Sequence, residues 1–338
     1  MVTKPSPTPT GADRRRGPFR AGDHVQLTDS KGRHHTFSLE KGEAFHTHRG
    51  IIDHDSLIGL EEGSVVATSS GTEYLAFRPL LRDYVLGMPR GAAIVYPKDA
   101  GQILSVGDVF PGARVVEAGV GSGSLAITLL RAVGDGGSLL SIERREDFAS
   151  IARANVEAFF GGPHPAWEVR VGSFAEVAPK ECPPGTVDRV VLDLLAPWEN
   201  LDAAATILAP GGVLVAYVAT TSQMSRLAED LRDHGGFTEP EASETMVRTW
   251  HLEGLAVRPD HRMIGHTGFL VSSRRAAPGI KVPQRKRRPA KGAYPVEGEW
   301  SAEDLGERMV SDRKIRRVTR AQAKDRRPKD ARDGKGES

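Results

Sequence analysis

Three glycines at alternate positions follow directly on an apolar run that ends in a carboxylate. The glycines are Gly119, Gly121 and Gly123, and the carboxylate is that of Glu117. Glycine lets the backbone turn sharply and come close to a ligand, and the first turn of a helix offers unpaired N–H groups. Since a helical pattern begins at Leu125, the segment predicts a strand, a tight turn and a helix that bind a nucleotide-like cofactor.

The spacing of the glycines distinguishes two kinds of cofactor site. A dinucleotide fingerprint, G-x-G-x-x-G, requires a glycine three residues after Gly121, where this chain has Ser124. The order found here, E-x-G-x-G-x-G, resembles the first motif of Rossmann-like S-adenosylmethionine-dependent methyltransferases, in which the turn holds the methionine end of the cofactor. The alternative is a plain glycine turn. The resemblance implies S-adenosylmethionine as cofactor and these residues as its binding turn: Glu117, Gly119, Val120, Gly121, Ser122, Gly123 and Ser124.

Three further polar residues end the next runs of strand type. Glu143 is in the position where a carboxylate accepts hydrogen bonds from both ribose hydroxyls. Ser173 occupies the place where related enzymes often carry an acid for the adenine amino group, and an uncharged hydroxyl there predicts weaker cofactor binding. Asp193 follows the fourth strand, with a helix-capping role as the alternative. Because ligands bind at the carboxyl ends of strands in open α/β sheets, we expect these residues and Glu117 to line one crevice.

The elements that must position these residues alternate regularly from Ala113 onward. This alternation predicts an α/β fold, a parallel sheet with helices on both faces. After Gly235 and Gly236, which should end the last helix, two strand-like runs predict an antiparallel pair that closes the sheet. The expected strands are 113–118, 138–143, 167–172, 187–193 and 211–220, with the closing pair at 248–257 and 267–273; the expected helices are 100–106, 123–133, 146–159, 198–208 and 222–234.

A small antiparallel β domain is predicted in front of this fold, over residues 18–85. Short alternating runs separated by turn residues indicate its strands, at 23–27, 35–39, 63–67 and 74–77. His46 and His48 have the spacing of two metal ligands on one strand face, but no third ligand with clear spacing accompanies them. Polar loop histidines are the alternative, and we expect no metal.

Composition excludes several classes of protein. The 338 residues suffice for a large core and a smaller domain, and no apolar run approaches the ~18 residues of a membrane span. The first residues lack the apolar stretch of a secretory signal, so we expect a cytoplasmic protein. A single cysteine, Cys182, excludes an internal disulfide framework and a multi-cysteine zinc site, and we expect it in a loop.

Both ends of the chain are basic. Residues 274–338 hold 20 Lys and Arg against 10 Asp and Glu, and residues 1–20 hold 5 against 1, which leaves 21 basic and 33 acidic residues between them. Residues 1–17 and 279–338 also lack periodicity, which predicts a disordered basic arm and a disordered basic tail. Such segments add affinity for phosphate backbones, or they are simply solvated.

Several motifs make the resemblance specific. They are Tyr96–Asp99, Glu117–Ser124, Leu192–Glu199, Phe45–Gly50, Met88–Gly91 and Gly265–Thr267. Together they resemble the tRNA (adenine-58-N1)-methyltransferases, closest to the actinobacterial form, over residues 18–278. The resemblance implies an N-terminal β domain, a methyltransferase domain over 86–278 with a seven-stranded Rossmann-like sheet, and a homotetramer. It also implies metal-free methylation of N1 of adenine 58 in the T-loop, with tRNA and neither DNA nor a membrane as partner.

The reaction assigns roles to four residues. N1 of adenine becomes cationic on methylation, and a carboxylate beside the base, Asp193, would hold its amine and stabilise the developing charge. Tyr96, matching the family's motif, would close the methyl pocket. His266 and Thr267 are candidates for the target-base side, with core or turn roles as the alternative. The base must leave its tertiary pair before reaction.

Two other functions remain open at this point. One is a methyltransferase of the same fold that acts on a protein carboxylate or a small molecule. The other is a catalytically silent tRNA-binding subunit, against which the retained glycines and Asp193 argue. A silent subunit should show no thermal shift on addition of S-adenosylmethionine.

Overall fold

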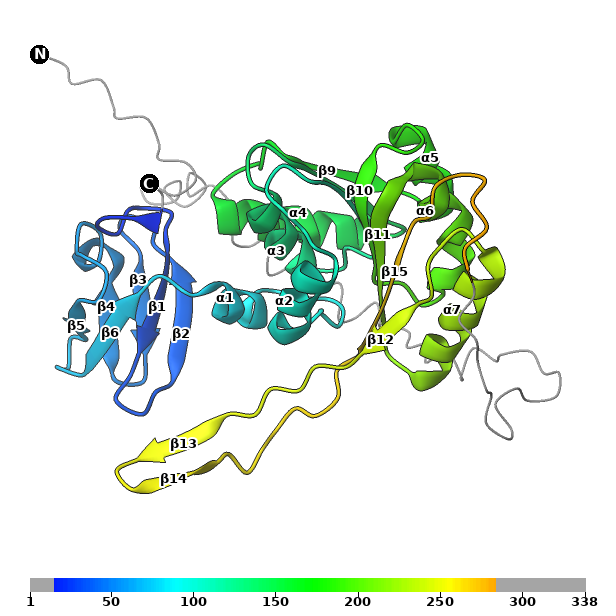
Figure 1. Ribbon diagram of the computed structural model, residues 1–338. Helices are drawn as coiled ribbons and strands as arrows, with labels where there is room; N and C mark the ends of the chain where they lie inside the picture. The colour runs from blue at the N-terminus through cyan, green and yellow to red at the C-terminus, as the bar shows by residue number, and fades with distance from the viewer. Residues whose placement is uncertain (1–14, 284–338) are drawn as a thin grey trace, which may run out of the picture. The chain divides into compact units, whose positions relative to one another are not determined.

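The computed structural model describes residues 15–283, which fall into two units (Figure 1). Within this range the first unit comprises residues 15–88 and 157–163, and the second comprises 89–156 and 164–283. Almost all of the predicted basic arm and tail lies outside the described residues.

The first unit contains the predicted antiparallel β domain. Its sheet has the order β2 (His34–Ser38), β1 (His24–Thr28), β6 (Glu73–Phe77), β5 (Val65–Ala67). A separate hairpin of β3 (Ala44–Thr47) and β4 (Gly50–Asp53) was not predicted, nor were the 3-10 turn η2 (His54–Ser56) and the helix α1 (Leu81–Gly87). The core of the unit is apolar and fully buried, with Phe19, Leu27, Leu39, Ile52 and Tyr74 each at most 2% exposed.

The second unit is the predicted Rossmann-like fold with a seven-stranded sheet. Its order is β12 (Glu241–Ser243), β15 (Phe269–Arg274), β11 (Leu208–Val218), β10 (Val187–Leu192), β7 (Arg114–Ala118), β8 (Ser138–Glu143), β9 (Trp167–Val171). The five strands from β11 to β9 run parallel, and β12 and β15 run antiparallel to their neighbours. The carboxyl ends of the parallel strands therefore meet at one edge, as the sequence predicts.

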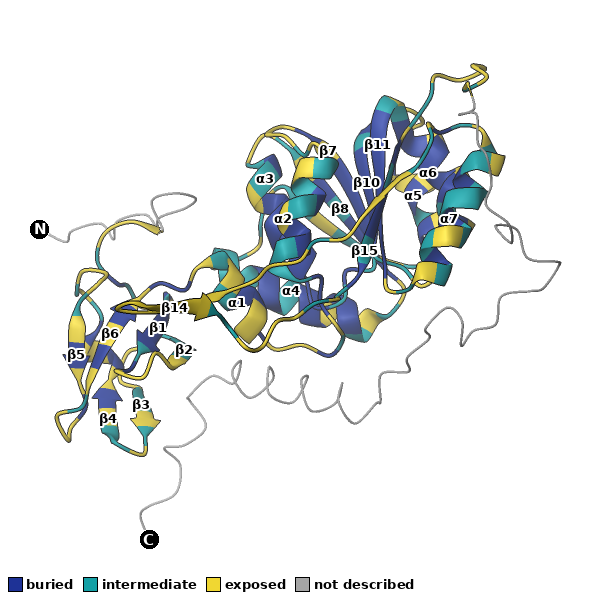
Figure 2. Ribbon diagram, turned by 60° about the horizontal axis from the view of Figure 1, so that its bottom comes forward, coloured by how far each residue is buried: buried dark blue, intermediate teal, exposed yellow. Residues whose placement is uncertain are grey.

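Helices cover both faces of this sheet (Figure 2). One group comprises α2 (Pro97–Val106), α3 (Ser124–Val133) and α4 (Glu146–Phe160); the other comprises α5 (Phe174–Glu181), the 3-10 turn η3 (Pro197–Asn200), α6 (Leu201–Ile207) and α7 (Thr221–His234). The short helix α5 was not predicted, and Cys182 is its buried C-cap residue. Gly235, with φ +68°, ends α7 as predicted.

The predicted pairing of 248–257 with 267–273 is wrong. β15 pairs with β11 and with β12, a strand of three exposed residues whose sequence, Glu-Ala-Ser, carries no apolar signal. The strands β13 (Trp250–Glu253) and β14 (Ala256–Pro259) pair only with each other. They form a narrow ribbon that extends away from the sheet of the second unit (Figure 1). We call residues 244–268, which carry this ribbon, the arm.

Between residues 15 and 283, no helix combines the length and the apolar composition that crossing a membrane requires.

Candidate active site

The glycine turn between β7 and α3 lies against the end of β10. Gly119 has φ +88°, and a Cβ atom there would lie 2.0 Å from the carbonyl oxygen of Asp193. Gly123 has φ +82°, and a Cβ there would lie 3.1 Å from the Val156 side chain on α4. The first glycine thus lets the turn approach Asp193, and the third lets α3 pack on α4.

Glu143, at the end of β8, holds the glycine turn in place. Its Oε2 accepts a hydrogen bond from the Gly121 N–H at 3.1 Å, and its Oε1 accepts one from the Arg145 N–H at 3.2 Å. The side chain is 8% exposed. Each carboxylate oxygen has a second lone pair, so Glu143 retains acceptor capacity for a ligand hydroxyl.

Glu117 is completely buried beneath the same turn. Its Oε2 accepts a hydrogen bond from Ser141 Oγ at 2.8 Å, and that hydroxyl accepts one from Trp167 Nε1 at 2.8 Å. Burial is the largest cause that raises the pKa of Glu117 to about 8. The hydrogen bond from Ser141 lowers this pKa, whereas the charges of Asp193 and Glu143 raise it further. Asp193 and Glu143 are thus close enough to disfavour the charge of Glu117, and a positively charged ligand would relieve this.

Two buried polar atoms near the turn have no hydrogen-bond partner among the described residues. They are Glu117 Oε1 and Ser122 Oγ. Buried polar atoms are nearly always paired in proteins, so this pair indicates that a ligand with polar groups completes the site. The residues fit the amino-acid and ribose parts of S-adenosylmethionine, which carry an ammonium and hydroxyl groups.

Asp193 follows the last residue of β10 and is half-buried. Its backbone N–H donates to the Ala118 carbonyl at 2.9 Å, which ties it to the end of β7. Burial, followed by the charge of Glu143, raises the pKa of Asp193 to about 7. The carboxyl group therefore changes charge near neutral pH. Perturbed pKa values of this kind cluster at functional sites.

Tyr96 and Ser173 both precede the first turn of a helix at this edge of the sheet. The Tyr96 carbonyl accepts from the N–H groups of Asp99 and Ala100, each at 2.9 Å, at the start of α2. Ser124 Oγ donates to the Val95 carbonyl at 3.1 Å and so brings the Tyr96 segment to the start of α3. Ser173 caps α5 without a side-chain cap bond and is half-buried, so its hydroxyl remains available.

His266 and Thr267 lie just before β15. His266 Nδ1 lies 2.7 Å from Glu244 Oε1 and its Nε2 lies 2.9 Å from the Ala219 carbonyl oxygen. Both contacts raise the pKa of His266, with Glu244 the larger cause. Because both ring nitrogens face acceptors, His266 ties the arm to the end of β11 and is not a free base.

A polar cluster that the sequence does not predict lies beside Thr267. Lys98 and Asp99 form a buried ion pair, with Nζ and Oδ1 2.7 Å apart, and Thr267 Oγ1 lies 2.6 Å from both Lys98 Nζ and Asp99 Oδ2. Burial raises the pKa of Tyr217, and the charges of Asp99 and Asp193 contribute. Tyr217 thus feels the charges of both this cluster and Asp193. The only sequence signal was a charged pair at the start of an apolar helix.

No group of three His, Cys, Asp or Glu side chains within residues 15–283 is arranged to hold a metal ion. His46 lies in β3, and His48 Nε2 accepts a hydrogen bond from Arg49 Nε at 3.2 Å in the following turn. The two histidines do not form a two-ligand strand face.

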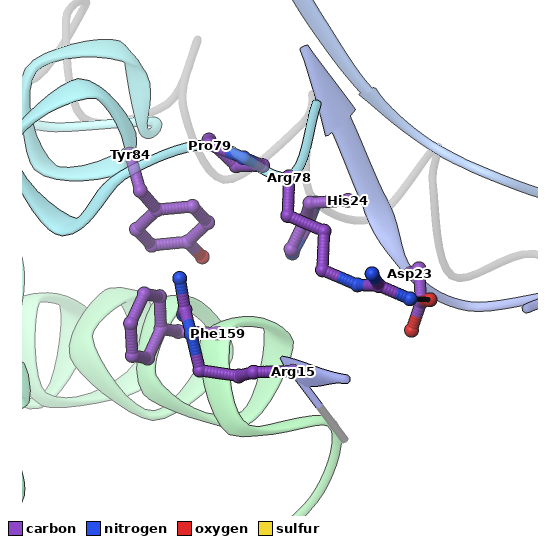
Figure 3. A pocket seen from close by; sticks show the side chains of 7 residues that line it. All are labelled: Arg15, Asp23, His24, Arg78, Pro79, Tyr84 and Phe159. Atoms are coloured by element: carbon purple, nitrogen blue, oxygen red, sulfur yellow. Dashed lines mark hydrogen bonds and ion pairs between the residues drawn. The ribbon is translucent and has the colours of Figure 1, made fainter. Parts of the chain in front are cut away.

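A small pocket of about 50 Å³ lies in the first unit (Figure 3), whereas the residues predicted to do chemistry belong to the second unit. Its charged wall includes Arg78, which makes a buried ion pair with Asp23 at 2.7 Å and a partly buried one with Glu62 at 2.9 Å. The volume suits one or two waters. We therefore assign the pocket no part in the reaction. Its lining residues are Arg15, Asp23, His24, Arg78, Pro79, Tyr84 and Phe159.

Two family models match this chain. A model described as TrmI-like N-terminal matches residues 17–66, and a model described as tRNA methyltransferase complex GCD14 subunit matches residues 75–258. The second match alone covers more than half of the chain. It contains the glycine turn, Glu143, Asp193 and the arm's ribbon up to β14.

Curated relatives and solved structures agree with these models. The tRNA (adenine(58)-N(1))-methyltransferase TrmI of Thermus thermophilus is 37% identical over 74% of this chain and 95% of its own length. The tRNA (adenine(57)-N(1)/adenine(58)-N(1))-methyltransferase TrmI of Methanocaldococcus jannaschii is 30% identical over 73% and 93%. Among solved structures, a SAM-dependent O-methyltransferase of Thermotoga maritima matches with a TM-score of 0.71 and 29% identity over 82% of this chain and all of its own. The tRNA (m1A58) methyltransferase TrmI of Aquifex aeolicus shares the fold, with a TM-score of 0.67 and 24% identity over 77% of this chain and all of its own.

Proposed function

The chain belongs to the tRNA (adenine-58-N1)-methyltransferase family, and from this premise we propose that it transfers a methyl group from S-adenosylmethionine to N1 of adenine 58 in the T-loop of tRNA. The observation that carries the proposal is the group of three carboxyls, Glu117, Glu143 and Asp193, around a glycine turn with two unpartnered buried atoms. Such a group favours a cationic cofactor.

When bound, S-adenosylmethionine supplies a methyl group activated by a positively charged sulfur. Glu117 Oε1 and Ser122 Oγ would bond its amino-acid part, and Glu143 would accept hydrogen bonds from the ribose hydroxyls. Ser173 would accept one from the adenine amino group. The glycine turn contributes close backbone approach, which side chains at Gly119 would prevent.

Asp193 would act on the target base. Its ionised carboxylate accepts a hydrogen bond from the exocyclic amine of adenine and stabilises the positive charge that develops on the ring. Tyr96, at the start of α2, would help to enclose the methyl group. Together these residues would orient the base for transfer, and alignment of this kind supplies a large part of the acceleration.

The test is methyl transfer from labelled S-adenosylmethionine to an unmodified tRNA transcript, with the product located by arrest of reverse transcription. Arrest at adenine 58 supports the assignment. A protein that binds the cofactor but labels no tRNA would belong to the methyltransferases of other acceptors. A protein that binds tRNA and no cofactor would be a silent subunit.

We further propose that the arm joins copies of this chain, as the homotetramer implied by the resemblance requires. In the β13–β14 ribbon Trp250 pairs with Pro259 and Leu252 pairs with Val257, so the four side chains share one face. Trp250, Leu252 and Val257 are 54%, 74% and 55% exposed. An isolated two-stranded ribbon is only marginally stable in water, and an exposed apolar face of this kind marks an interaction surface. A second copy, presenting the same face, would cover it.

We expect Leu252→Lys to shift the protein to a smaller species in sedimentation at micromolar concentration. A lysine in a closed apolar interface loses the burial of leucine, about 2 kcal/mol in each copy, and adds an unpaired charge. Ala256→Lys is the matched control, because Ala256 is exposed on the opposite face of the ribbon. A wild type that is monomeric, or a Leu252→Lys variant of unchanged mass, would contradict the proposal.

Ser173 offers a test of the cofactor assignment in which a substitution should strengthen the binding of S-adenosylmethionine. We expect Ser173→Asp to bind S-adenosylmethionine about threefold more tightly in calorimetry, because a carboxylate is a stronger acceptor for the adenine amino group than a hydroxyl. The start of α5 favours a negative charge. Glu176→Gln, which alters a charge in the first turn of the same helix, should leave the affinity unchanged. Weaker binding by Ser173→Asp would remove residue 173 from the cofactor site.

With tRNA as substrate, we propose the cytoplasm as the compartment. The basic segments at the two ends of the chain, residues 1–17 and 279–338, lie almost wholly outside the described residues. We propose that they contact phosphates.

A further inference from the structure

The ammonium group of Lys98 joins three segments that are far apart in the sequence. Its Nζ donates to Asp99 Oδ1 at 2.7 Å, to the Thr245 carbonyl at 2.6 Å and to Thr267 Oγ1 at 2.6 Å. An ammonium has three N–H donors, so all of them are used. Thr267 Oγ1 in turn donates to Asp99 Oδ2 at 2.6 Å.

Two of these partners are the two ends of the arm. Thr245 follows β12 at the point where the chain leaves the sheet, and Thr267 precedes β15 where it returns. Lys98 therefore holds both ends of the arm against the first turn of α2. The Lys98 and Asp99 side chains are 10% and 2% exposed. Charges buried to this degree are favourable only when every partner is in place, so the cluster specifies one position of both arm ends.

The same cluster borders the candidate active site. Tyr96 stands two residues before Lys98, at the cap of α2. Tyr217, at the end of β11, is 9% exposed, and the charge of Asp99 contributes to the raised pKa of its hydroxyl. Gly268 packs on the ring so closely that a Cβ would lie 2.3 Å from Tyr217 Cζ. A shift of the arm ends would thus displace Tyr217.

We propose that Lys98 is a positioning residue that makes the geometry of the active site depend on the placement of the arm. It does not touch the reacting atoms; it acts through Asp99 and Thr267 on Tyr217, and through α2 on Tyr96. The inference rests on the proposed methyl transfer to tRNA. It adds that the base side of the site is assembled only when both arm ends are held.

We expect Lys98→Met to lower kcat for tRNA methylation about 30-fold, because a misplacement of about 1 Å can cost 100-fold. The dissociation constant of S-adenosylmethionine should change less than threefold, since Glu117, Glu143 and the glycine turn are untouched. Hydrogen exchange should become faster at both ends of the arm, at residues 244–249 and 262–268. Thr267→Val, which keeps the shape and removes the hydroxyl, should reproduce these changes more mildly.

A double variant separates positioning from simple charge neutralisation. If Lys98 only neutralises the buried Asp99, then Lys98→Met with Asp99→Asn should recover activity. We expect no recovery, because the Thr245 carbonyl and Thr267 still lack their donor. Arg153→Met is the control; it breaks an exposed ion pair of α4 with Glu146 and should leave kcat and exchange unchanged.

Three results would overturn the proposal: a kcat of Lys98→Met within twofold of wild type, recovery in the double variant, or a fall in kcat with unchanged exchange of the arm ends. Failure of the proposed function is distinguishable from these. If the wild type methylates no tRNA, arm exchange and cofactor affinity still report on Lys98. Faster exchange with retained cofactor affinity would then keep the positioning role and discard the substrate.

Discussion

Replacing Asp193 with asparagine is expected to lower kcat for tRNA methylation by about 10³-fold while the protein still binds S-adenosylmethionine. Asparagine keeps the size of the side chain and an acceptor oxygen but lacks the charge that would stabilise the cationic base. Removal of a group that acts on developing charge typically costs 10²- to 10³-fold. Cofactor affinity should fall by less than about tenfold, because Glu117, Glu143 and the glycine turn remain in the site.

The pH dependence of the wild type tests the same residue. Since the pKa of Asp193 is raised to about 7 in the ligand-free protein, its carboxyl is increasingly protonated, and inactive, below that pH. We therefore expect kcat/KM to rise steeply with pH up to about pH 7, and then less steeply up to about pH 8 as Glu117 ionises. A bound cation favours the ionised form, so kcat should level off at lower pH. Measurements from pH 5.5 to 9 should leave in Asp193→Asn only the rise caused by the ionisation of Glu117, up to about pH 8; an unchanged slope in that variant would assign the titration to another group.

The acidic residues of the site could be predicted because they stand at strand ends. Parallel strands bring their carboxyl ends to one edge, so Glu117, Glu143 and Asp193 had to meet once the strands were recognised. The structure adds what no spacing encodes. Ser141 and Trp167 hold the buried Glu117, and burial together with the charge of Glu143 raises the pKa values of Glu117 and Asp193.

Contacts between distant segments could not be predicted in this way. Lys98 and Thr267 are 169 residues apart, and neither lies in a periodic pattern that places it beside the other. The predicted pairing of 248–257 with 267–273 is wrong for a related reason. The run around Trp250 has the composition of a sheet strand, but its apolar side chains are exposed within the chain, and the partner we propose for them is another copy. The strand that pairs with β15 at the edge of the sheet, Glu241–Ser243, is too short and polar to be recognised.

Replacing Glu117 with glutamine is expected to stabilise the ligand-free protein at alkaline pH and to weaken its cofactor binding. The pKa of Glu117 is raised from 4.5 to about 8 in the fold, so the folded protein binds a proton that the unfolded chain has lost over this range. The free energy of unfolding contributed by this group therefore falls as pH rises from about 4.5 to 8. Glutamine is neutral throughout and avoids the loss. It can still accept the Ser141 hydrogen bond, although its amide N–H groups lack a partner.

We expect the net gain at pH 8 to be about 1–3 kcal/mol, since one pKa unit corresponds to about 1.4 kcal/mol and the unpaired amide offsets part of it. The melting temperature should rise by about 2–6 °C at pH 8 and by much less at pH 5. The rise in melting temperature produced by S-adenosylmethionine should become smaller, because the ammonium of the cofactor loses a carboxylate partner.

Glu168→Gln, which replaces an exposed acid of β9, should change neither the melting temperature nor its rise on addition of the cofactor. A Glu117→Gln variant that melts lower at both pH values would mean that the carboxyl is a structural hydrogen-bonding group. An unchanged cofactor shift would mean that Glu117 is not in the cofactor site. The expected combination, more stable and less able to bind, is that of a binding residue kept at a cost in stability.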